Sequence, residues 1–253
     1  MPDRLPLPLP LRLQLRRWSL AALRALLPSN CALCGSSCDD VVCPPCRAQY
    51  AAPRTARCPR CANPLLPGAT GGTVCGGCSM VPPAYDATVA AVDYAAPLDQ
   101  LVLQLKFGAR LPLAPWFAGL LRDAILARGA AALPDLLCPV PLGPGRLVER
   151  GFNQALEIAR PLAASLGVPL YPALAQRTLD TSAQSGVTPD ERAHNVSGAF
   201  AVADPDRVAG RHVGLVDDVM TSGSTLGELA ATFKRFGAAR VTNLVFARTP
   251  PLA

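Results

Sequence analysis

The chain has 253 residues, of which 50% are hydrophobic and 17% are charged, and its formal net charge is +6. This length suits one ordinary domain plus a smaller one, and the apolar content excludes a largely disordered protein. No stretch has the about 18 continuous apolar residues that a membrane-spanning helix needs. Prolines and arginines interrupt the leucines of residues 1–27, unlike a secretory signal, so we expect a soluble cytoplasmic protein.

The positive charge lies in the N-terminal third of the chain. Residues 1–85 hold nine arginines and three aspartates, whereas residues 86–253 are balanced. Two explanations stay open: a basic surface for nucleic acid, or arginines that neutralise negatively charged metal sites. We assign residues 1–30 to a linker. Within it, the leucines and arginines of residues 11–27 predict a short amphipathic helix that docks on the chain itself, on a partner or on a membrane surface.

Residues 31–85 contain four Cys-x-x-Cys pairs and are predicted to form a separate small domain. The eight cysteines are Cys31, Cys34, Cys43, Cys46, Cys58, Cys61, Cys75 and Cys78. Each Cys-x-x-Cys turn points two thiolates at one metal ion, and two turns complete a tetrahedral zinc site without an open position. Disulfides would need an oxidising compartment, so we predict two structural zinc ions. Pairing in sequence order is the simpler arrangement, and a crossed arrangement is the alternative.

The same region is too poor in apolar side chains to fold by burial alone. Residues 31–80 offer only eight large ones, so bound metal must supply the folding energy. Two further cysteines lie outside the pairs. Cys38 is a spare thiol or an exchange ligand of the first site. Cys138 lies in an apolar run that predicts a buried side chain.

Residues 86–253 alternate between strand and helix patterns and form the third predicted segment. Short apolar runs predict strands at 87–93, 136–140, 213–216 and 241–246. Helical periodicity predicts helices at 98–106, 113–128, 153–166 and 225–236. Strands that alternate with helices in this way indicate an α/β domain with a doubly wound, mostly parallel sheet.

Residues 212–226 read HVGLVDDVMTSGSTL and carry the clearest chemical signal. A buried strand is predicted to end at Asp217 and Asp218, followed by a loop rich in glycine and hydroxyl groups and then by a helix. Free backbone N–H groups and the helix dipole at such a turn favour a phosphate. Two adjacent acids repel phosphate, so they must face sugar hydroxyls or a divalent cation. Together these features describe a site for a ribose 5-phosphate.

This segment resembles the phosphoribosyl pyrophosphate (PRPP) loop of type I phosphoribosyltransferases. The resemblance implies that Asp217 and Asp218 bind the ribose hydroxyls of PRPP, which is bound together with Mg²⁺. It assigns the 5-phosphate to Thr221, Ser222, Gly223, Ser224 and Thr225. The alternative is an ordinary turn whose acids cap the helix, but a cap needs one acid and no run of hydroxyls. Purine-salvage relatives carry an acid where this chain has Thr221, which argues against a 6-oxopurine acceptor.

Residues 140–155 read VPLGPGRLVERGFNQA. With the cysteine pairs and the PRPP loop, this stretch resembles the ComF family, in which a double zinc ribbon precedes a phosphoribosyltransferase-like domain. The resemblance covers residues 26–248, and the string from Arg150 to Gln154 is typical of the family. In related transferases the loop after the strand that corresponds to residues 136–140 binds pyrophosphate. In this chain that loop is residues 141–146, and Arg146 and Arg150 are the candidates to neutralise the charge of the pyrophosphate. The alternative for Arg150 is an ion pair with a carboxylate.

Two more places match the family pattern. Lys106 is expected to bind an anion on the pyrophosphate side. The polar stretch 178–200, which contains Gln184 and Arg192, corresponds to a loop that closes over the active site, and a disordered loop is the alternative. Neither His194 nor His212 lies in a pattern typical of a catalytic base, so no catalytic residue is assigned.

Three functions are consistent with these features. The first is transfer of a phosphoribosyl group from Mg-PRPP to an unidentified acceptor. The second, which the ComF resemblance implies, is handling of single-stranded DNA in natural competence, alongside DNA-processing proteins. The DNA-contacting residues would be Arg47, Arg54, Arg57 and Arg60, although only Tyr50 and Tyr85 offer stacking platforms there. The third is a PRPP sensor without turnover. The oligomeric state does not follow from the sequence.

Overall fold

The computed structural model describes residues 29–52, 56–66, 68–69, 72–129, 133–178 and 198–250. The chain forms two compact units, residues 1–49 and 50–253. This division falls between the two predicted zinc sites. The predicted segment boundaries at residues 30 and 85 follow the sequence pattern and stay a prediction. The predicted N-terminal amphipathic helix lies outside the described residues.

The first unit contains the first group of cysteines. β1 (Ser29–Asn30) pairs antiparallel with β2 (Ser37–Cys38), and the turn between them carries Cys31 and Cys34. α2 (Pro44–Tyr50) follows and carries Cys46. Val42 and three of the four cysteines are the buried residues of this described part. Such a small apolar core agrees with folding that depends on metal.

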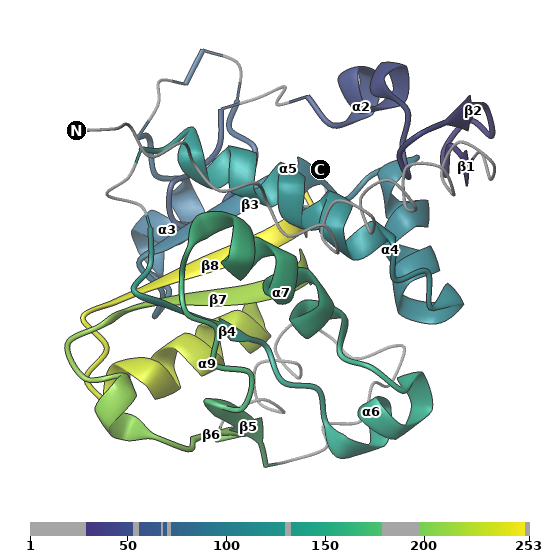
Figure 1. Ribbon diagram of the computed structural model, residues 1–253. Coiled ribbons are helices and arrows are strands. Elements are labelled where there is room, and N and C mark those ends of the chain that lie inside the picture. Colours follow the sequence, from purple (N-terminus) through teal and green to yellow (C-terminus); the bar gives the residue numbers. More distant parts are fainter. Residues whose placement is uncertain are drawn as a thin grey trace, which may run out of the picture. The chain divides into compact units, whose positions relative to one another are not determined.

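The second unit is built on a four-stranded parallel sheet with the order β3-β8-β7-β4 (Figure 1). Its strands are β3 (Ala87–Asp93), β4 (Leu136–Pro139), β7 (His212–Met220) and β8 (Arg240–Arg248). The two central strands are buried on both faces along most of their length. This burial explains why they appear in the sequence as continuous apolar runs instead of alternating patterns.

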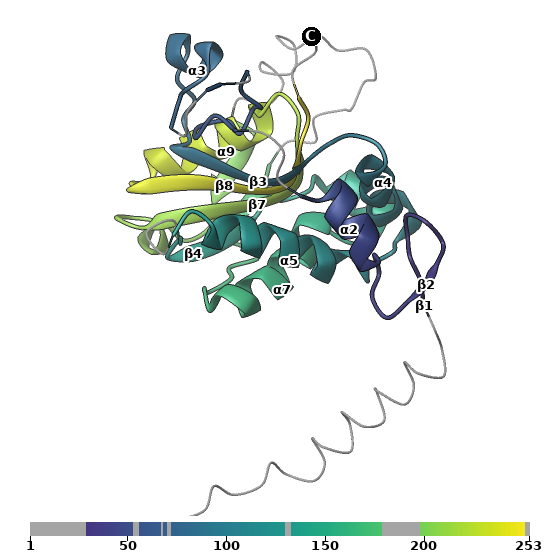
Figure 2. The same ribbon diagram turned by 90° about the horizontal axis from the view of Figure 1, so that it is seen from above.

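Helices cover both faces of this sheet, which confirms the predicted doubly wound α/β fold. α5 (Leu113–Leu126) and α7 (Gln154–Leu166) pack on one face, and α9 (Ser224–Arg235) packs on the other (Figure 2). α4 (Leu98–Gly108) lies beside α5. The rings of Phe117 and Phe246 stack with centroids 3.6 Å apart, and Trp116 contacts both rings. These aromatic contacts hold α5 against β8.

The second group of cysteines belongs to this larger unit. Cys58, Cys61 and Cys78 are buried in one apolar cluster with Met220 and Leu226. α3 (Gly76–Met80) lies on the same side of the sheet as α9 (Figure 2). The N–H of Thr88 in β3 donates to the carbonyl of Pro59 at 3.1 Å. We call residues 58–78 the second zinc knuckle; it extends the core on the α9 face.

Two strands are longer than the sequence predicts, and the sequence patterns do not predict α2 and α3 beside the cysteines or a helix after β4. β7 continues to Met220 and β8 to Arg248, because these two residues extend the parallel ladder beyond the apolar runs. The helix after β4, α6 (Pro144–Arg150), occupies half of the predicted pyrophosphate loop. Pro144 suits the first turn of a helix, and Gly151 ends it with a φ of 74°. The predicted boundaries 141–146 for that loop are therefore wrong.

The ends of the polar stretch 178–200 are held by a small ladder. β5 (Ala175–Arg177) pairs antiparallel with β6 (Phe200–Val202), and the short 3₁₀ turn η2 (Pro205–Arg207) follows. Gln184 and Arg192, the candidates of the predicted closing loop, lie outside the described residues. In the part of the chain that the structure describes, no helix has the length and apolar character to cross a membrane.

Gly214→Ala should lower the free energy of unfolding by about 1–3 kcal/mol, because an added Cβ overpacks the sheet. That atom would lie 2.7 Å from Cδ2 of Leu137 and 2.8 Å from Cγ of Pro134. The control is Gly227→Ala in α9, where no atom outside the helix backbone lies within 4 Å of the added Cβ. It should raise stability by about 0.5–1 kcal/mol. Urea unfolding followed by circular dichroism compares them, and destabilisation by both would contradict the packing argument.

Candidate functional site

The turn from β7 into α9 forms the centre of the site. We call residues 221–225 the hydroxyl loop. Gly223 has a φ of 83°, a left-handed conformation that glycine adopts without strain, and it turns the chain from the strand into the helix. The hydroxyl oxygens of Ser222 and Ser224 lie 2.9 Å apart. The loop thus presents its hydroxyl groups close together at the carboxyl end of β7.

Several backbone N–H groups of the hydroxyl loop have no acceptor. Within the described chain, no hydrogen bond is formed by the N–H groups of Ser222, Gly223 or Thr225. The positive end of the α9 dipole lies at the same place. The loop borders a hollow of about 50 Å³, lined by Asp217 and residues 219–226. The hollow therefore offers N–H and hydroxyl donors to an anion such as phosphate.

Asp217 lines the same hollow and carries an uncompensated acidic group. Its Oδ1 accepts a hydrogen bond from the N–H of Asp218 at 2.8 Å, and no cationic side chain of the described chain pairs with it. Burial and the neighbouring Asp218 carboxylate raise the pKa of Asp217 well above its usual range. Hydroxyl donors or a divalent cation would satisfy this carboxylate, which fits the predicted ribose and Mg²⁺ role.

Asp218 has a different partner from the one that the family resemblance implies. Successive side chains of a strand point to opposite faces, and Asp218 is only 2% exposed. Its Oδ2 lies 2.9 Å from Nζ of Lys106 in α4. The structure thus brings Lys106 to the site through Asp218. Ribose binding by Asp218 and anion binding by Lys106 stay predictions, and in this structure the two groups neutralise each other.

The candidate arginines of the pyrophosphate side lie on α6. The guanidinium of Arg150 lies over the ring of Phe107, 5.3 Å from the ring centroid. Phe107 directly follows Lys106 in the chain. The partner of Arg150 is therefore an aromatic ring and not the carboxylate that the sequence analysis gave as the alternative. Arg146 is partly exposed on the same helix and has no ion pair with any described carboxylate. Both charges remain candidates for a diphosphate.

The string from Arg150 to Gln154 has a structural role that we did not predict. Asn153 caps α7, because its Oδ1 accepts hydrogen bonds from the N–H groups of Ala155 at 2.9 Å and Leu156 at 3.4 Å. Its Nδ2 donates to the carbonyl of Val140 at the end of β4. Asn153 therefore sets the start of α7 against the sheet edge. The sequence signal for this cap is an asparagine directly before a helical pattern, because asparagine is a preferred residue at the N-terminal cap of a helix.

The described histidine is not at the site. His212 lies at the other end of β7, with Nε2 2.8 Å from Oγ1 of Thr242 and Nδ1 3.1 Å from the carbonyl of Leu133. Burial lowers the pKa of His212 below its usual value. This environment is that of a buried structural residue. His194 lies outside the described residues.

The eight paired cysteines form two groups of four, each in sequence order. Within each group all sulfur atoms lie within 4.8 Å of one another, and the separations include 3.7 Å for Cys34 and Cys43 and 3.5 Å for Cys61 and Cys75. A tetrahedral zinc ion with 2.3 Å bonds needs sulfur separations of about 3.8 Å. A disulfide needs about 2.05 Å. The geometry therefore fits two structural zinc ions, without the crossed pairing and without disulfides.

Backbone donors support the same conclusion for the first group. The N–H groups of Leu33 and Cys43 each donate to Sγ of Cys31 at 3.4 Å. Burial would raise the pKa of Cys31, but hydrogen bonds from the N–H groups of Cys43, Cys34 and Leu33 outweigh it and lower the pKa to about 6, which favours the thiolate of Cys31. Burial instead raises the pKa of Cys46 to about 12. Cys38 lies outside the group and donates to the carbonyl of Asp40. Cys138 is fully buried, as predicted, and burial raises its pKa to about 12.

Comparisons with known proteins agree with both parts of the chain. Residues 22–79 match the family model of a double zinc ribbon domain, and residues 153–251 match that of a phosphoribosyl transferase domain. DNA utilization protein YhgH of Salmonella typhimurium is 38% identical over 199 residues, which cover 78% of this chain and 86% of the relative. Competence protein F of Haemophilus influenzae is 33% identical over 168 residues, which cover 64% of this chain and 73% of the relative. The chain belongs to the ComF family.

This ComF protein thus combines a double zinc ribbon with a phosphoribosyltransferase-like domain, as predicted. Among solved structures, a glutamine PRPP amidotransferase from B. subtilis is 19% identical, with a TM-score of 0.35 over 52% of this chain and 26% of the other. That likeness is too weak to bear on the site. The residues around the hydroxyl loop carry the chemical argument by themselves.

The ComF chain should bind two zinc ions, and the two sites should differ in their effect on stability. Cys58→Ser should leave one zinc ion and lower the melting temperature by more than about 4 °C, because the second knuckle is part of the main core. Cys34→Ser should also leave one zinc ion but should spare the main transition, because its site lies in the other compact unit. Native mass spectrometry and thermal unfolding measure both effects. Equal losses of melting temperature would contradict this difference.

Asp217→Asn should stabilise the ligand-free ComF protein at neutral pH. A carboxyl whose pKa is raised on folding binds its proton more tightly in the folded state, so stability falls as pH rises above about 4. An asparagine at this position does not titrate, so the variant does not lose this stability as pH rises. The variant should exceed the wild type in stability at pH 7, and the difference should shrink as pH falls below about 4. Denaturant titrations from pH 3 to 8 would test this, and a variant less stable at pH 7 would refute it.

Proposed function

We propose that this ComF protein binds PRPP with Mg²⁺ at the hydroxyl loop and transfers the phosphoribosyl group to an acceptor, within the use of incoming DNA. One observation carries the proposal: a single hollow collects an uncompensated carboxyl group and several free backbone donors. A phosphate needs the donors, and the hydroxyls of a sugar need the carboxylate. A ribose 5-phosphate satisfies both sets of groups at once.

The residues of the hollow divide this binding between them. The N–H groups of Ser222, Gly223 and Thr225, with the loop hydroxyls, would hold the 5-phosphate against the start of α9. Asp217 would accept hydrogen bonds from the ribose hydroxyls and is the candidate oxygen ligand for Mg²⁺. When bound, Mg²⁺ would supply charge neutralisation for the diphosphate. Lys106, Arg146 and Arg150 would add positive charge on the pyrophosphate side.

In the transfer, the bond from the ribosyl carbon C1 to the pyrophosphate oxygen breaks, and a bond from C1 to the acceptor forms. An acceptor atom that carries a proton gives it up to water or to the departing pyrophosphate. The pyrophosphate leaves with the bonding electrons, so positive charge develops on the sugar. The protein's part is positioning and electrostatic stabilisation, for which a carboxylate beside the ribose is well placed.

The place of this reaction in DNA use follows from the relatives. Their names, DNA utilization protein and competence protein, associate them with the use of DNA, and we infer the same for this chain. The structure changes one expectation about DNA contacts. Arg57 pairs with Asp93 at 2.8 Å and donates to the carbonyl of Ala62, so its charge is already engaged. A strand of DNA would have to use the other arginines of the N-terminal third.

A second candidate function is a PRPP sensor without turnover. It is favoured by the position of His212, which lies at the far end of β7 from the hydroxyl loop. Around the loop, the described chain offers no histidine as a general base, and its lysine, Lys106, is paired with Asp218. Such a site would bind PRPP tightly and leave it intact.

Isothermal titration calorimetry with Mg-PRPP tests the binding common to both functions. Asp217→Asn should weaken binding at least about tenfold, because it removes charge-assisted hydrogen bonds to the ribose. Since the same substitution is expected to stabilise the ligand-free protein, weaker binding would not reflect unfolding. The control is Asp204→Asn, which changes an exposed acid that pairs with Arg207 and should leave the affinity unchanged.

Pyrophosphate release then separates the two functions. Release from Mg-PRPP in the presence of bases, amines or single-stranded oligonucleotides would support transfer. Tight binding without release would support the sensor. If the wild-type protein does not bind Mg-PRPP at all, both functions are wrong.

A further inference from the structure

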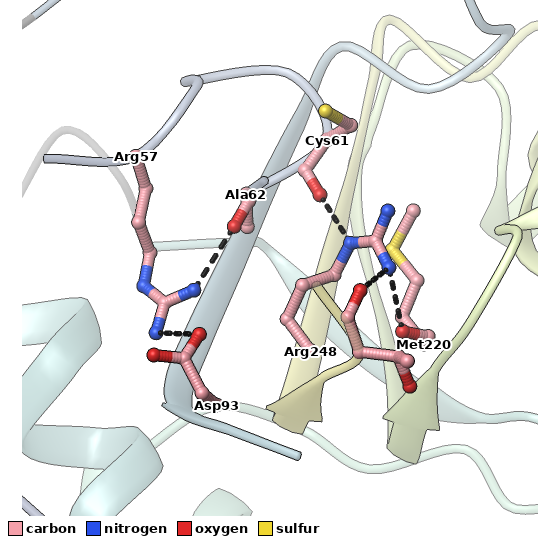
Figure 3. Close-up of polar contacts among 7 residues, drawn as sticks. Arg57, Cys61, Ala62, Asp93, Met220 and Arg248 are labelled. Atoms are coloured by element: carbon pink, nitrogen blue, oxygen red, sulfur yellow. Dashed lines mark hydrogen bonds and ion pairs between the residues drawn. The ribbon is translucent and has the colours of Figure 1, made fainter. Parts of the chain in front are cut away.

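Arg248, the last residue of β8, connects two parts of the larger unit that are far apart in the sequence. Its side chain is 5% exposed. Its Nε donates to the carbonyl of Cys61 in the second zinc knuckle at 2.9 Å, and its Nη1 donates to the carbonyl of Met220 at 2.9 Å (Figure 3). The carbonyls of Thr221 and Thr249 also lie within hydrogen-bond distance of Nη1, so its two hydrogens are shared among three acceptors. One guanidinium thus holds a zinc-ligand residue and the first residues of the turn into α9.

These contacts bear on the orientation of the hydroxyl loop. The peptide unit is planar and trans, so the carbonyl of Met220 and the N–H of Thr221 point in opposite directions. The same holds for the carbonyl of Thr221 and the N–H of Ser222. Because Arg248 draws both carbonyls toward itself, it directs the first two N–H groups of the loop away from itself. The position of the guanidinium therefore sets the direction of donors that border the hollow.

The buried guanidinium of Arg248 also lacks a carboxylate partner at the knuckle, within the described residues. Its described hydrogen-bond acceptors are all backbone carbonyls, and no carboxylate pairs with it in the described chain. A zinc ion with four thiolates carries a formal charge of −2. The metal-loaded second site would thus supply the negative charge that a buried guanidinium needs. Loading of this site and the placement of Arg248 should stabilise each other.

The knuckle and the hydroxyl loop share the apolar core beneath α9, where Cys58, Cys61 and Cys78 cluster with Met220 and Leu226. They also border one cavity of about 430 Å³, whose lining includes Asn63, Cys75, Ser222 and Gly227. Arg248 lines this cavity and hydrogen-bonds both to the knuckle and to the turn into α9. The guanidinium is therefore the polar link by which the state of the zinc site can reach the loop.

A second arginine offers a natural comparison. Arg57 donates from Nη1 to the carbonyl of Ala62 at 3.1 Å, the residue next to Cys61, and its Nη2 lies 2.8 Å from Oδ1 of Asp93 (Figure 3). It therefore fastens the same knuckle to the end of β3. It makes no described contact with the hydroxyl loop. Arg57 and Arg248 thus share the anchoring role, and only Arg248 touches the turn into α9.

We propose that Arg248 is a positioning residue that couples zinc in the second knuckle to phosphate binding at the hydroxyl loop. The proposal rests on the proposed function, because it takes the loop to be the site of the 5-phosphate. Coupling between two sites is reciprocal in binding free energy, so zinc should strengthen phosphate binding and a bound sugar phosphate should strengthen zinc binding at the second site. We expect this tighter binding to slow the loss of zinc from that site. The first zinc site lies in the other compact unit and should not respond.

Zinc release to a colour-forming chelator, with and without saturating ribose 5-phosphate, tests this coupling in the wild-type chain. We expect two release phases, one of which slows at least about fivefold when ribose 5-phosphate is bound. In Cys34→Ser, which lacks the first site, the remaining phase should be the one that slows. If ribose 5-phosphate binds to the wild type and neither phase changes, the coupling is refuted while the proposed function stands. If ribose 5-phosphate does not bind to the wild type, the proposed function fails first.

The variants Arg248→Met and Arg57→Met then identify the residue that carries the coupling. Arg248→Met should weaken ribose 5-phosphate binding about tenfold in calorimetry and should abolish the protection of zinc. Arg57→Met should release zinc faster but keep both the affinity and the protection. Arg248→Lys, which keeps the charge with fewer directed donors, should give an intermediate result. Equal losses in the Arg57 and Arg248 variants would refute a specific role for Arg248.

Discussion

At the junction of β7 and α9, the chain holds a carboxyl group without a cationic partner and a set of backbone donors without acceptors around one small hollow, within the described residues. Folding normally pairs such groups, because an unpaired polar group at a partly buried position costs stability. The carboxyl end of a parallel sheet is also where ligands usually bind in α/β proteins. The rest of the larger unit is best understood as a frame that keeps these groups in place and unpaired.

That frame uses metal where an apolar core would be too small. The first group of cysteines is the centre of its own compact unit, with few apolar residues around it. The second group is instead continuous with the core beneath α9. Two sites with the same ligands and similar spacing therefore have different structural roles. The difference explains how one zinc ion can stabilise a separate module while the other contributes to the architecture around the hydroxyl loop.

The balance of charge around the loop shows a related division. Asp218 and Lys106 form a nearly buried pair, whereas the neighbouring Asp217 faces the hollow and has no ion pair with a described cationic side chain. In an alternating strand, adjacent acids cannot share one environment, so one acid is neutralised and the other is left for a ligand. On the pyrophosphate side, Arg150 stacks on Phe107 and so keeps its charge while its position is restrained.

Much of the architecture was predictable from local patterns. The eight central elements were found because buried parallel strands and amphipathic helices have clear periods, and the metal sites because each turn of two cysteines is local. Two features that the sequence analysis does not predict have local signals. Pro144 and Gly151 bound an unexpected helix, and Asn153 caps the next one. The ladder between β5 and β6 joins short segments on either side of a long stretch, which no single window of sequence can show.

The sequence by itself determined the order of strands and helices, the two sets of four thiolates, and the run of acids and hydroxyl groups where a strand meets a helix. Each of these is written in neighbouring residues, so its geometry follows from backbone rules alone. Only the tertiary structure decided which distant groups meet. Arg248 reaches Cys61 across 187 residues, and Lys106 reaches Asp218 from a helix early in the domain. Such pairings depend on how the whole sheet packs, because no local preference specifies a partner so far along the chain.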